Sequence, residues 1–206
     1  MTFDQKWEKI HKAKQWGRYP REELIRWTAR HYGQTPSNLR SGIKFLDLGC
    51  GQGASSWFLD REGYTVSAVD GSASAIKKLK QWLPLPDVHC CDFVKLPYPD
   101  RYFDGVVDIV SVAHNENCKE IYKEVARVLK VGGRLLSIVP QSTADRTVYQ
   151  DKGATTFFTK EELLTMLNGN YRSAIGFSSF NDAGEKAVIQ QWLVDALRID
   201  PIKTKF

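Results

Sequence analysis

The feature that constrains this chain most is a short apolar stretch that runs directly into three alternating glycines. Ile43–Leu48 has the length and composition of a buried strand, and Gly49, Gly51 and Gly53 follow it at alternate positions. A helical pattern then covers Ala54–Glu62. Because glycine has no Cβ, the turn can take unusual dihedral angles and lie directly against a ligand. A strand, a glycine-rich turn and a helix in this order predict a nucleotide-binding corner of an α/β domain.

The spacing of this turn differs from that of a dinucleotide site. The glycines form G-x-G-x-G, whereas a dinucleotide site uses G-x-G-x-x-G to bring a helix N-terminus against a pyrophosphate. Asp47 stands at the end of the predicted strand, just before the first glycine of this motif, where its carboxylate would repel a pyrophosphate. We therefore expect a ligand that carries positive charge at this point, such as an α-ammonium group.

Two further carboxylates follow predicted strands. Tyr64–Asp70 is largely apolar up to its last residue, and Asp70 lies 23 residues after Asp47 (70 − 47). An acidic side chain at the tip of the second strand is placed to accept hydrogen bonds from the ribose hydroxyls of a bound adenosine. Val88–Cys91 is the third predicted strand, and Asp92 after it is placed to accept a hydrogen bond from an adenine amino group.

Five short motifs resemble those of the class I S-adenosylmethionine-dependent methyltransferases and occur in the order of that family. They are Asp47-Leu-Gly-Cys-Gly-Gln-Gly53, Val69-Asp70-Gly-Ser72, Cys91-Asp92-Phe93, Phe103-Asp104-Gly-Val-Val107 and Arg127-Val-Leu-Lys-Val-Gly-Gly133. The resemblance covers residues 43–140 and implies an α/β fold: a Rossmann-like, seven-stranded, mostly parallel sheet with an antiparallel last strand and helices on both faces. It also implies S-adenosyl-L-methionine as methyl donor and S-adenosyl-L-homocysteine as product.

The same resemblance implies a set of donor-binding residues. They are Asp47, Gly49, Cys50, Gly51, Gly53, Asp70, Gly71, Asp92, Phe93 and Asp108. Asp108 is also open to a second role, since it stands near a strand end and is placed to orient an acceptor group.

Composition agrees with one α/β domain of 206 residues, since 42% of the residues are hydrophobic and 26% are charged. No apolar run approaches the ~18 residues needed to span a membrane. The first residues lack the apolar core of a signal peptide, so we expect a cytoplasmic protein. The cysteines Cys50, Cys90, Cys91 and Cys118 show no C-x-x-C spacing, and we expect them to be reduced and to hold no zinc.

The charge balance does not indicate a nucleic-acid binder. The chain has 29 basic and 24 acidic residues, a net charge of +5, but its basic residues are spread out. Lys77, Lys78 and Lys80 lie on a helix that is expected to face solvent. A preference for anionic substrates is the alternative interpretation. We expect a small-molecule acceptor, no membrane or nucleic-acid partner, and a monomer or homodimer.

Residues 1–41 are predicted to form an N-terminal helical cap on a donor-binding domain of residues 42–206. The first helix covers 3–14 and places Phe3, Trp7, Ile10 and Lys14 on one face. The second runs from Pro20 to Tyr32, with Leu24, Ile25, Thr28 and Tyr32 facing inward. Caps of this kind in the family close over the donor, so Trp16 and Tyr19 between the helices are predicted to contact the substrate. Plain packing against the core is the alternative for both.

The remaining pattern alternates strands and helices, which indicates a parallel sheet. Helices are predicted over 73–82, 118–129 and, from a Thr159–Glu162 capping box, up to Leu167. Strands are predicted over 103–109 and 134–139, and a final hairpin over 171–180 and 187–197. Gln141–Thr156 is a sixteen-residue polar connection at the edge where ligands bind, so we expect it to be functional.

The candidate general base is His114, which follows the strand 103–109 on the side that faces the acceptor in this family. A structural or capping histidine is the alternative. Asp145 and Arg146 in the long connection are predicted to contact the acceptor. His11, His31 and His89 have no convergent partners in the sequence and receive no role. No metal is expected, although Asp108, Asn115 and Asp145 are of ligand type.

Three functions fit the sequence. The first is a methyltransferase that acts on a small molecule, at oxygen in preference to nitrogen or carbon. The second is a non-enzymatic donor-binding module or a partner-dependent subunit. The third is a methyltransferase for protein or RNA, which the net charge of +5 leaves open.

Overall fold

The computed structural model describes residues 5–144, 155–181 and 188–200. Its helices are α1 (Gln5–Ala13), α2 (Glu22–Tyr32), α3 (Ala54–Arg61), α4 (Ala73–Trp82), α5 (Cys118–Val128) and α6 (Lys160–Leu167), with short 3-10 turns η1 (Ser37–Gly42) and η2 (Val112–His114). Its strands are β1 (Lys44–Leu48), β2 (Thr65–Asp70), β3 (Asp87–Cys90), β4 (Phe103–Ile109), β5 (Leu129–Pro140), β6 (Tyr171–Asn181) and β7 (Val188–Arg198). No helix in these ranges is long and apolar enough to cross a membrane.

The seven strands form one sheet in the order β3-β2-β1-β4-β5-β7-β6. Strands β1 to β5 pair in parallel, and β7 pairs antiparallel with both β5 and β6. This arrangement confirms the predicted sheet with an antiparallel last strand. The order reverses at β1, which has β2 on one side and β4 on the other, and ligands of open α/β sheets bind at such a point.

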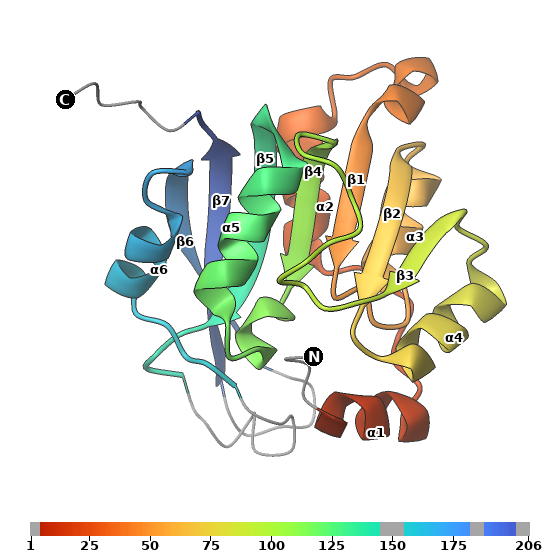
Figure 1. The fold of residues 1–206 in the computed structure, drawn as a ribbon, viewed down its shortest axis with the longest axis horizontal. Helices are drawn as coiled ribbons and strands as arrows, with labels where there is room; N and C mark the ends of the chain where they lie inside the picture. The colour runs from red at the N-terminus through yellow and green to blue at the C-terminus, as the bar shows by residue number, and fades with distance from the viewer. Residues whose placement is uncertain (1–4, 145–154, 182–187, 201–206) are drawn as a thin grey trace.

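Helices cover both faces of the sheet (Figure 1), where α5 lies in front and α2 behind. One hydrophobic cluster joins α5 and α6 to one face through Ile121, Val125 and Leu163. The other joins α2, α3 and α4 to the opposite face. Because the central strands are buried on both faces, they have largely apolar sequences, which is why β4 has the bounds predicted from the sequence. Helix α4 also has the predicted bounds, and the Ser72 side chain caps its start.

The helix α2 is part of the packed layer, because Leu24 and Trp27 are buried in the same cluster as Phe45 of β1. The prediction that Ile25 faces inward is wrong, since it is 40% exposed. The helix begins at Glu22, with Arg21 as its N-cap, so Pro20 is not its first residue. From that start, residues at 24, 27 and 28 share the sheet-facing side, and position 25 falls beside it.

The helix α1 lies apart from this layer, at the edge of the sheet near α4 (Figure 1). Phe3 lies outside the described residues, while Trp7 and Ile10 of the predicted face are half-buried. Lys14 is exposed and follows the end of the helix, whereas His11 is buried, one turn after Trp7. The buried face of α1 is therefore rotated from the predicted one, toward position 11.

The start of β5 differs from the sequence prediction. The strand begins at Leu129, directly after α5, and not at residue 134. Leu129 pairs with Phe103 before the register shifts to Gly105 and Arg134. Because of this pairing between distant segments, β5 includes residues 129–133, although their local sequence is typical of a turn. The capping box of Thr159 and Glu162 is confirmed at the start of α6.

Candidate functional site

The glycine turn after β1 is folded back onto the end of β2. Gly49 has a positive φ of 73°, and a Cβ at this position would collide with the side chain of Ser111. The backbone N–H groups of Gly49 and Cys50 donate to the carbonyl of Val69 at 2.8 and 2.9 Å. Gly53, with φ 96°, is the N-cap of α3. The turn therefore needs glycine for its backbone geometry and joins the carboxyl ends of two strands.

Asp70 stands at the end of β2 and lines a cavity next to this turn. Its carboxylate accepts hydrogen bonds from the backbone N–H groups of Gly51 and Ser72, both at 2.8 Å. Burial raises the pKa of Asp70 to about 6, and these two hydrogen bonds oppose the rise. The carboxylate thus holds the glycine turn against the start of α4, and its predicted contact with a ribose would add to that structural role.

Asp47 is buried under the turn and does not line the cavity in this structure. Its carboxylate accepts a hydrogen bond from the Ser56 hydroxyl of α3. Burial raises the pKa of Asp47 to about 7, and the nearby carboxylates of Asp70 and Asp108 add to the rise. The predicted contact with an ammonium group stays a prediction, and the observed role of Asp47 is to tie β1 to α3.

The cavity has a volume of about 480 Å³ and lies at the carboxyl ends of β1, β2 and β4. Of the predicted donor residues, Gly49, Cys50, Gly51, Asp70 and Phe93 line it. The lining does not include Asp47, Gly53, Gly71, Asp92 or Asp108. The donor contacts predicted for these five stay predictions; Asp92 accepts a hydrogen bond from the backbone N–H of Val94 at 3.3 Å.

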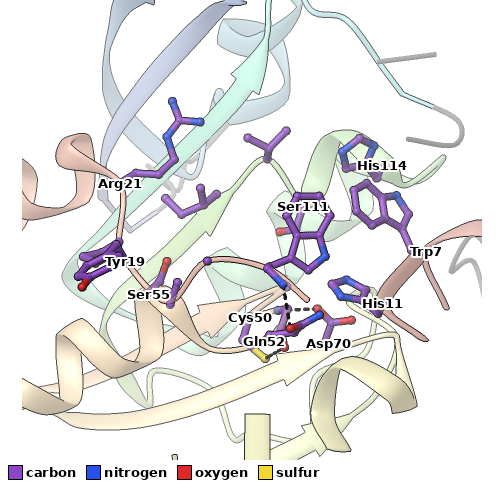
Figure 2. Close-up of a pocket in the computed structure, with 18 of the residues that line it drawn as sticks. Trp7, His11, Tyr19, Arg21, Cys50, Gln52, Ser55, Asp70, Ser111 and His114 are labelled. Atoms are coloured by element: carbon purple, nitrogen blue, oxygen red, sulfur yellow. Dashed lines mark hydrogen bonds between the residues drawn. The ribbon is translucent and has the colours of Figure 1, made fainter. Parts of the chain in front are cut away.

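The N-terminal segment forms one wall of the cavity (Figure 2), where Trp7 and His11 are drawn near His114. Glu8 anchors α1, because its carboxylate accepts hydrogen bonds from the hydroxyls of Ser72 and Ser74 at the start of α4. An anion at a helix N-terminus is also favoured by the helix dipole. The aromatic wall is therefore attached to the start of α4 through Glu8.

The segment after α1 is attached to the glycine turn through Gln52. The backbone N–H of Trp16 donates to Gln52 Oε1 at 3.1 Å, and Gln52 Nε2 donates to the carbonyl of Lys14 at 2.8 Å. Trp16 and Tyr19 both line the cavity, and Tyr19 is 87% exposed. The structure thus places both predicted substrate residues at the cavity, while their contact with a substrate stays a prediction.

A buried network holds the residues after β4. The carboxylate of Asp108, which is fully buried, accepts hydrogen bonds from the hydroxyls of Ser111 and Ser137 and from the backbone N–H of Val112. Burial raises the pKa of Asp108, and these hydrogen bonds oppose the rise. Val110, a β-branched residue, has a positive φ of 69° in this turn. Strain of this kind persists only where surrounding structure holds it, and it concentrates at functional sites.

His114 ends the turn η2 and is buried at the cavity wall. Its Nδ1 lies 3.1 Å from the hydroxyl oxygen of Thr155, and its ring lies 4.5 Å from the ring of Trp7. These contacts orient the imidazole from two sides. Asp145 and Arg146, which are predicted to contact the acceptor, lie outside the described residues.

Sequence reasoning missed several residues at the cavity. Trp7 and His11 lie one turn apart in α1, a spacing that signals a shared face but not its purpose. Gln52, inside the glycine motif, also lines the cavity. So do Arg21 and Gln191, which come from distant segments, and Arg21 Nη2 donates to Gln191 Oε1 at 3.0 Å. Local sequence carries no signal for the last pair, because only the fold brings β7 next to the start of α2.

The described residues contain no group of three histidine, cysteine or acidic side chains that is arranged to hold a metal. All four cysteines are free thiols. Burial raises the pKa of the Cys50 thiol well above its ordinary value, and the nearby carboxylates of Asp70 and Asp47 add to the rise.

Both the sequence and the fold are similar to those of known proteins. Residues 46–137 match a family model described as a methyltransferase domain. The chain is 32% identical over 106 residues to 24-methylenesterol C-methyltransferase 2 of Arabidopsis thaliana, covering 48% of this chain and 29% of that protein. It is 31% identical over 121 residues to 27-O-demethylrifamycin SV methyltransferase of Amycolatopsis mediterranei, covering 55% of this chain and 44% of that protein. The chain thus spans less than half the length of these relatives.

A solved structure of an S-adenosylmethionine-dependent methyltransferase from Methanosarcina mazei has the same fold. Its TM-score is 0.66 at 20% identity, over 76% of this chain and 92% of that chain. Residues 46–137 thus match a methyltransferase-domain family model. The fold around them is that of a solved S-adenosylmethionine-dependent methyltransferase structure.

Proposed function

We propose that this protein is an S-adenosylmethionine-dependent methyltransferase that transfers a methyl group to an oxygen of a small-molecule acceptor. The observation that carries the proposal is one cavity that Asp70 and the glycine turn line together with His114 and the N-terminal aromatic residues. The predicted donor-binding residues and the candidate base thus face the same cavity. Relatives that are named for sterol and rifamycin methylation support a small acceptor.

The residues present fit the donor. The cavity volume of about 480 Å³ falls within the range of small-molecule sites, roughly 300–1,000 Å³. Gly49 and Gly51 leave one wall without Cβ atoms, and Asp70 stands beside them. When bound, the donor supplies a methyl group that its sulfonium charge has already activated.

The protein's own contribution is to position the acceptor and to accept its proton. Holding reacting groups in line supplies ~7–11 kcal/mol of a barrier in favourable cases. Trp7, Trp16 and Tyr19 would shield the reacting groups from water, and His114 would take the proton of an acceptor hydroxyl. In this role residues 1–41 act as a cap over the domain of residues 42–206.

The first test is calorimetry with S-adenosyl-L-homocysteine, for which we expect binding at micromolar strength. The second is methyl transfer from labelled donor to a panel of sugars, phenols, small acids, peptides and RNA. Transfer to an oxygen of a sugar, phenol or acid supports the proposal. Transfer to peptide or RNA alone would overturn the small acceptor. Binding of a nicotinamide cofactor without binding of either sulfur ligand would overturn the whole assignment.

A further inference from the structure

Three buried ring nitrogens, on residues that line the cavity, have no hydrogen-bond partner. They are Nε1 of Trp7, Nδ1 of His11 and Nε1 of Trp16. Among the described residues only two other side-chain atoms share this condition, on Thr28 and Tyr98, and neither residue lines the cavity. Leaving a buried polar group unpaired is costly, and such groups in a native structure call for an explanation.

The three rings form one cluster over the glycine turn. Their centroids lie 5.7 Å apart for Trp7 and His11, 6.5 Å for Trp7 and Trp16, and 6.3 Å for His11 and Trp16. A Cβ added to Gly51 would lie 3.5 Å from Cε1 of His11, and Trp16 is bonded through its backbone to Gln52. The residues with unpaired nitrogens thus lie together on the cavity wall next to the glycine turn.

The chemistry of these atoms limits the group that would satisfy them. An indole N–H can only donate, so a partner for Trp7 and Trp16 must accept. His11 is buried, and burial lowers its pKa to about 4, so the ring is neutral at pH 7 and carries one N–H. In the tautomer with this hydrogen on Nδ1, the unpaired nitrogen is a donor. A carboxylate is acceptor-only, with room for three such donors.

The surrounding charges also permit an anion. The Lys14 ammonium lies 4.2 Å from the ring centroid of Trp16, and the Lys78 charge acts on His11. The nearby carboxylates are already engaged: Glu8 accepts from the Ser72 and Ser74 hydroxyls, and Asp70 from backbone N–H groups. Their negative charge is therefore partly compensated.

We propose that Trp7, His11 and Trp16 form a subsite that binds a carboxylate of a small-molecule ligand through their unpaired ring nitrogens. The inference deepens the proposed function and rests on it. Two ligands bring this chemistry to the cavity: the methionine end of the donor and an acceptor that is itself a carboxylic acid. Both sources use the same three nitrogens, and the experiment below separates them.

The test uses Trp7→Phe and Trp16→Phe, which keep an aromatic ring and remove only the N–H group. Trp192→Phe is the matched control, because its Nε1 donates to the Phe158 carbonyl at 2.8 Å. Calorimetry would compare S-adenosyl-L-homocysteine with its decarboxylated analogue S-adenosyl-3-thiopropylamine. A second arm would titrate benzoate and benzamide, with and without S-adenosyl-L-homocysteine. Thermal unfolding without ligand would be recorded for each variant.

If the donor supplies the carboxylate, both cavity variants should bind S-adenosyl-L-homocysteine roughly 10- to 100-fold more weakly, with the decarboxylated analogue unaffected. If the acceptor supplies it, the variants should lose binding of benzoate and keep that of S-adenosyl-L-homocysteine. In either case the melting temperature of the free protein should be unchanged for Trp7→Phe and Trp16→Phe and lower for Trp192→Phe.

The subsite is overturned if both variants bind S-adenosyl-L-homocysteine and benzoate as the wild type does. It is also overturned if they weaken the decarboxylated analogue as much as the parent compound, since the lost contact would then not be the carboxylate. A wild-type protein that binds benzoate in preference to benzamide but no S-adenosyl-L-homocysteine would overturn the proposed function and leave the subsite standing. Absence of binding to both would overturn both proposals.

Discussion

At the scale of single residues, Asp70 joins structure and predicted ligand binding. Removing its carboxylate in Asp70→Ala leaves the buried N–H groups of Gly51 and Ser72 without their acceptor. We expect a loss of unfolding free energy of about 1–3 kcal/mol, from urea titration, and a loss of ligand affinity of about 1.5–3 kcal/mol, from calorimetry with S-adenosyl-L-homocysteine. Asp60→Ala, at an exposed position of α3, is the control. An unchanged dissociation constant would show that Asp70 does not contact the ribose.

The buried carboxylate of Asp47 should make stability depend on pH. Burial raises its pKa to about 7, whereas an ordinary aspartate in the unfolded chain titrates near ~4. Between these values the folded state holds a proton that the unfolded state releases, so this contribution to stability is lost as pH rises through the window. His11, with its pKa lowered to about 4, acts in the opposite direction as pH falls from ~6.5.

Comparison with Asp47→Asn isolates the first contribution, since asparagine keeps an acceptor for Ser56 but does not titrate. We expect the variant to gain stability relative to the wild type when the pH is raised from 4.5 to 8, measured by urea unfolding at both values without ligand. Asp60→Asn, at an exposed position of α3, is the control. A stability difference that is the same at both pH values would contradict the raised pKa.

His114 has two possible roles that a single substitution separates. If it is the general base, His114→Ala should lower turnover by about 10²–10⁴-fold and leave the affinity for S-adenosyl-L-homocysteine unchanged. The assay would use the acceptor identified by profiling, with methyl transfer shown to be rate-limiting. His89→Ala, at an exposed position of β3, is the control. Turnover within about threefold of wild type would leave positioning alone as the source of catalysis.

At the scale of elements, Glu8 attaches α1 to the start of α4, and Lys78 of α4 adds a hydrogen bond to the carbonyl of Lys12. Glu8→Ala removes the acceptor of the Ser72 and Ser74 hydroxyls, so α1 should separate from the cavity more often. We expect faster hydrogen exchange across residues 5–13 and weaker S-adenosyl-L-homocysteine binding, with exchange in the central strands unaffected. Glu22→Ala, which breaks an exposed ion pair with Arg26, is the control. Unchanged exchange in α1 would show that Glu8 is not its anchor.

At the scale of the whole molecule, α2 should unfold together with the sheet. Leu24 is fully buried against the cluster that contains Phe45, whereas its neighbour Ile25 is 40% exposed. We expect Leu24→Ala to lower the unfolding free energy by about 2–5 kcal/mol and Ile25→Ala by much less. Tryptophan fluorescence and circular dichroism should report one shared transition for both variants. Two separate transitions would instead show that residues 1–41 fold as an independent unit.

The sequence by itself determined the central α/β unit, because its signals are local. The apolar run of β1, the glycine turn and the helix α3 follow one another within twenty residues, and the capping box of α6 spans four. Strand β4 and helix α4 have the predicted bounds because they are buried or capped by their own residues. Glycine spacing and strand-end carboxylates were sufficient to indicate the family.

Only the tertiary structure decided the composition of the cavity wall. His11 received no role from the sequence, since a lone histidine in a helix carries no local signal, yet packing buries it over the glycine turn. Asp47 has the residue type of a ligand contact, but the fold directs its carboxylate to Ser56. Arg21 and Gln191 meet although 170 residues separate them. Periodicity specifies which residues share a face, whereas long-range packing decides what that face contacts.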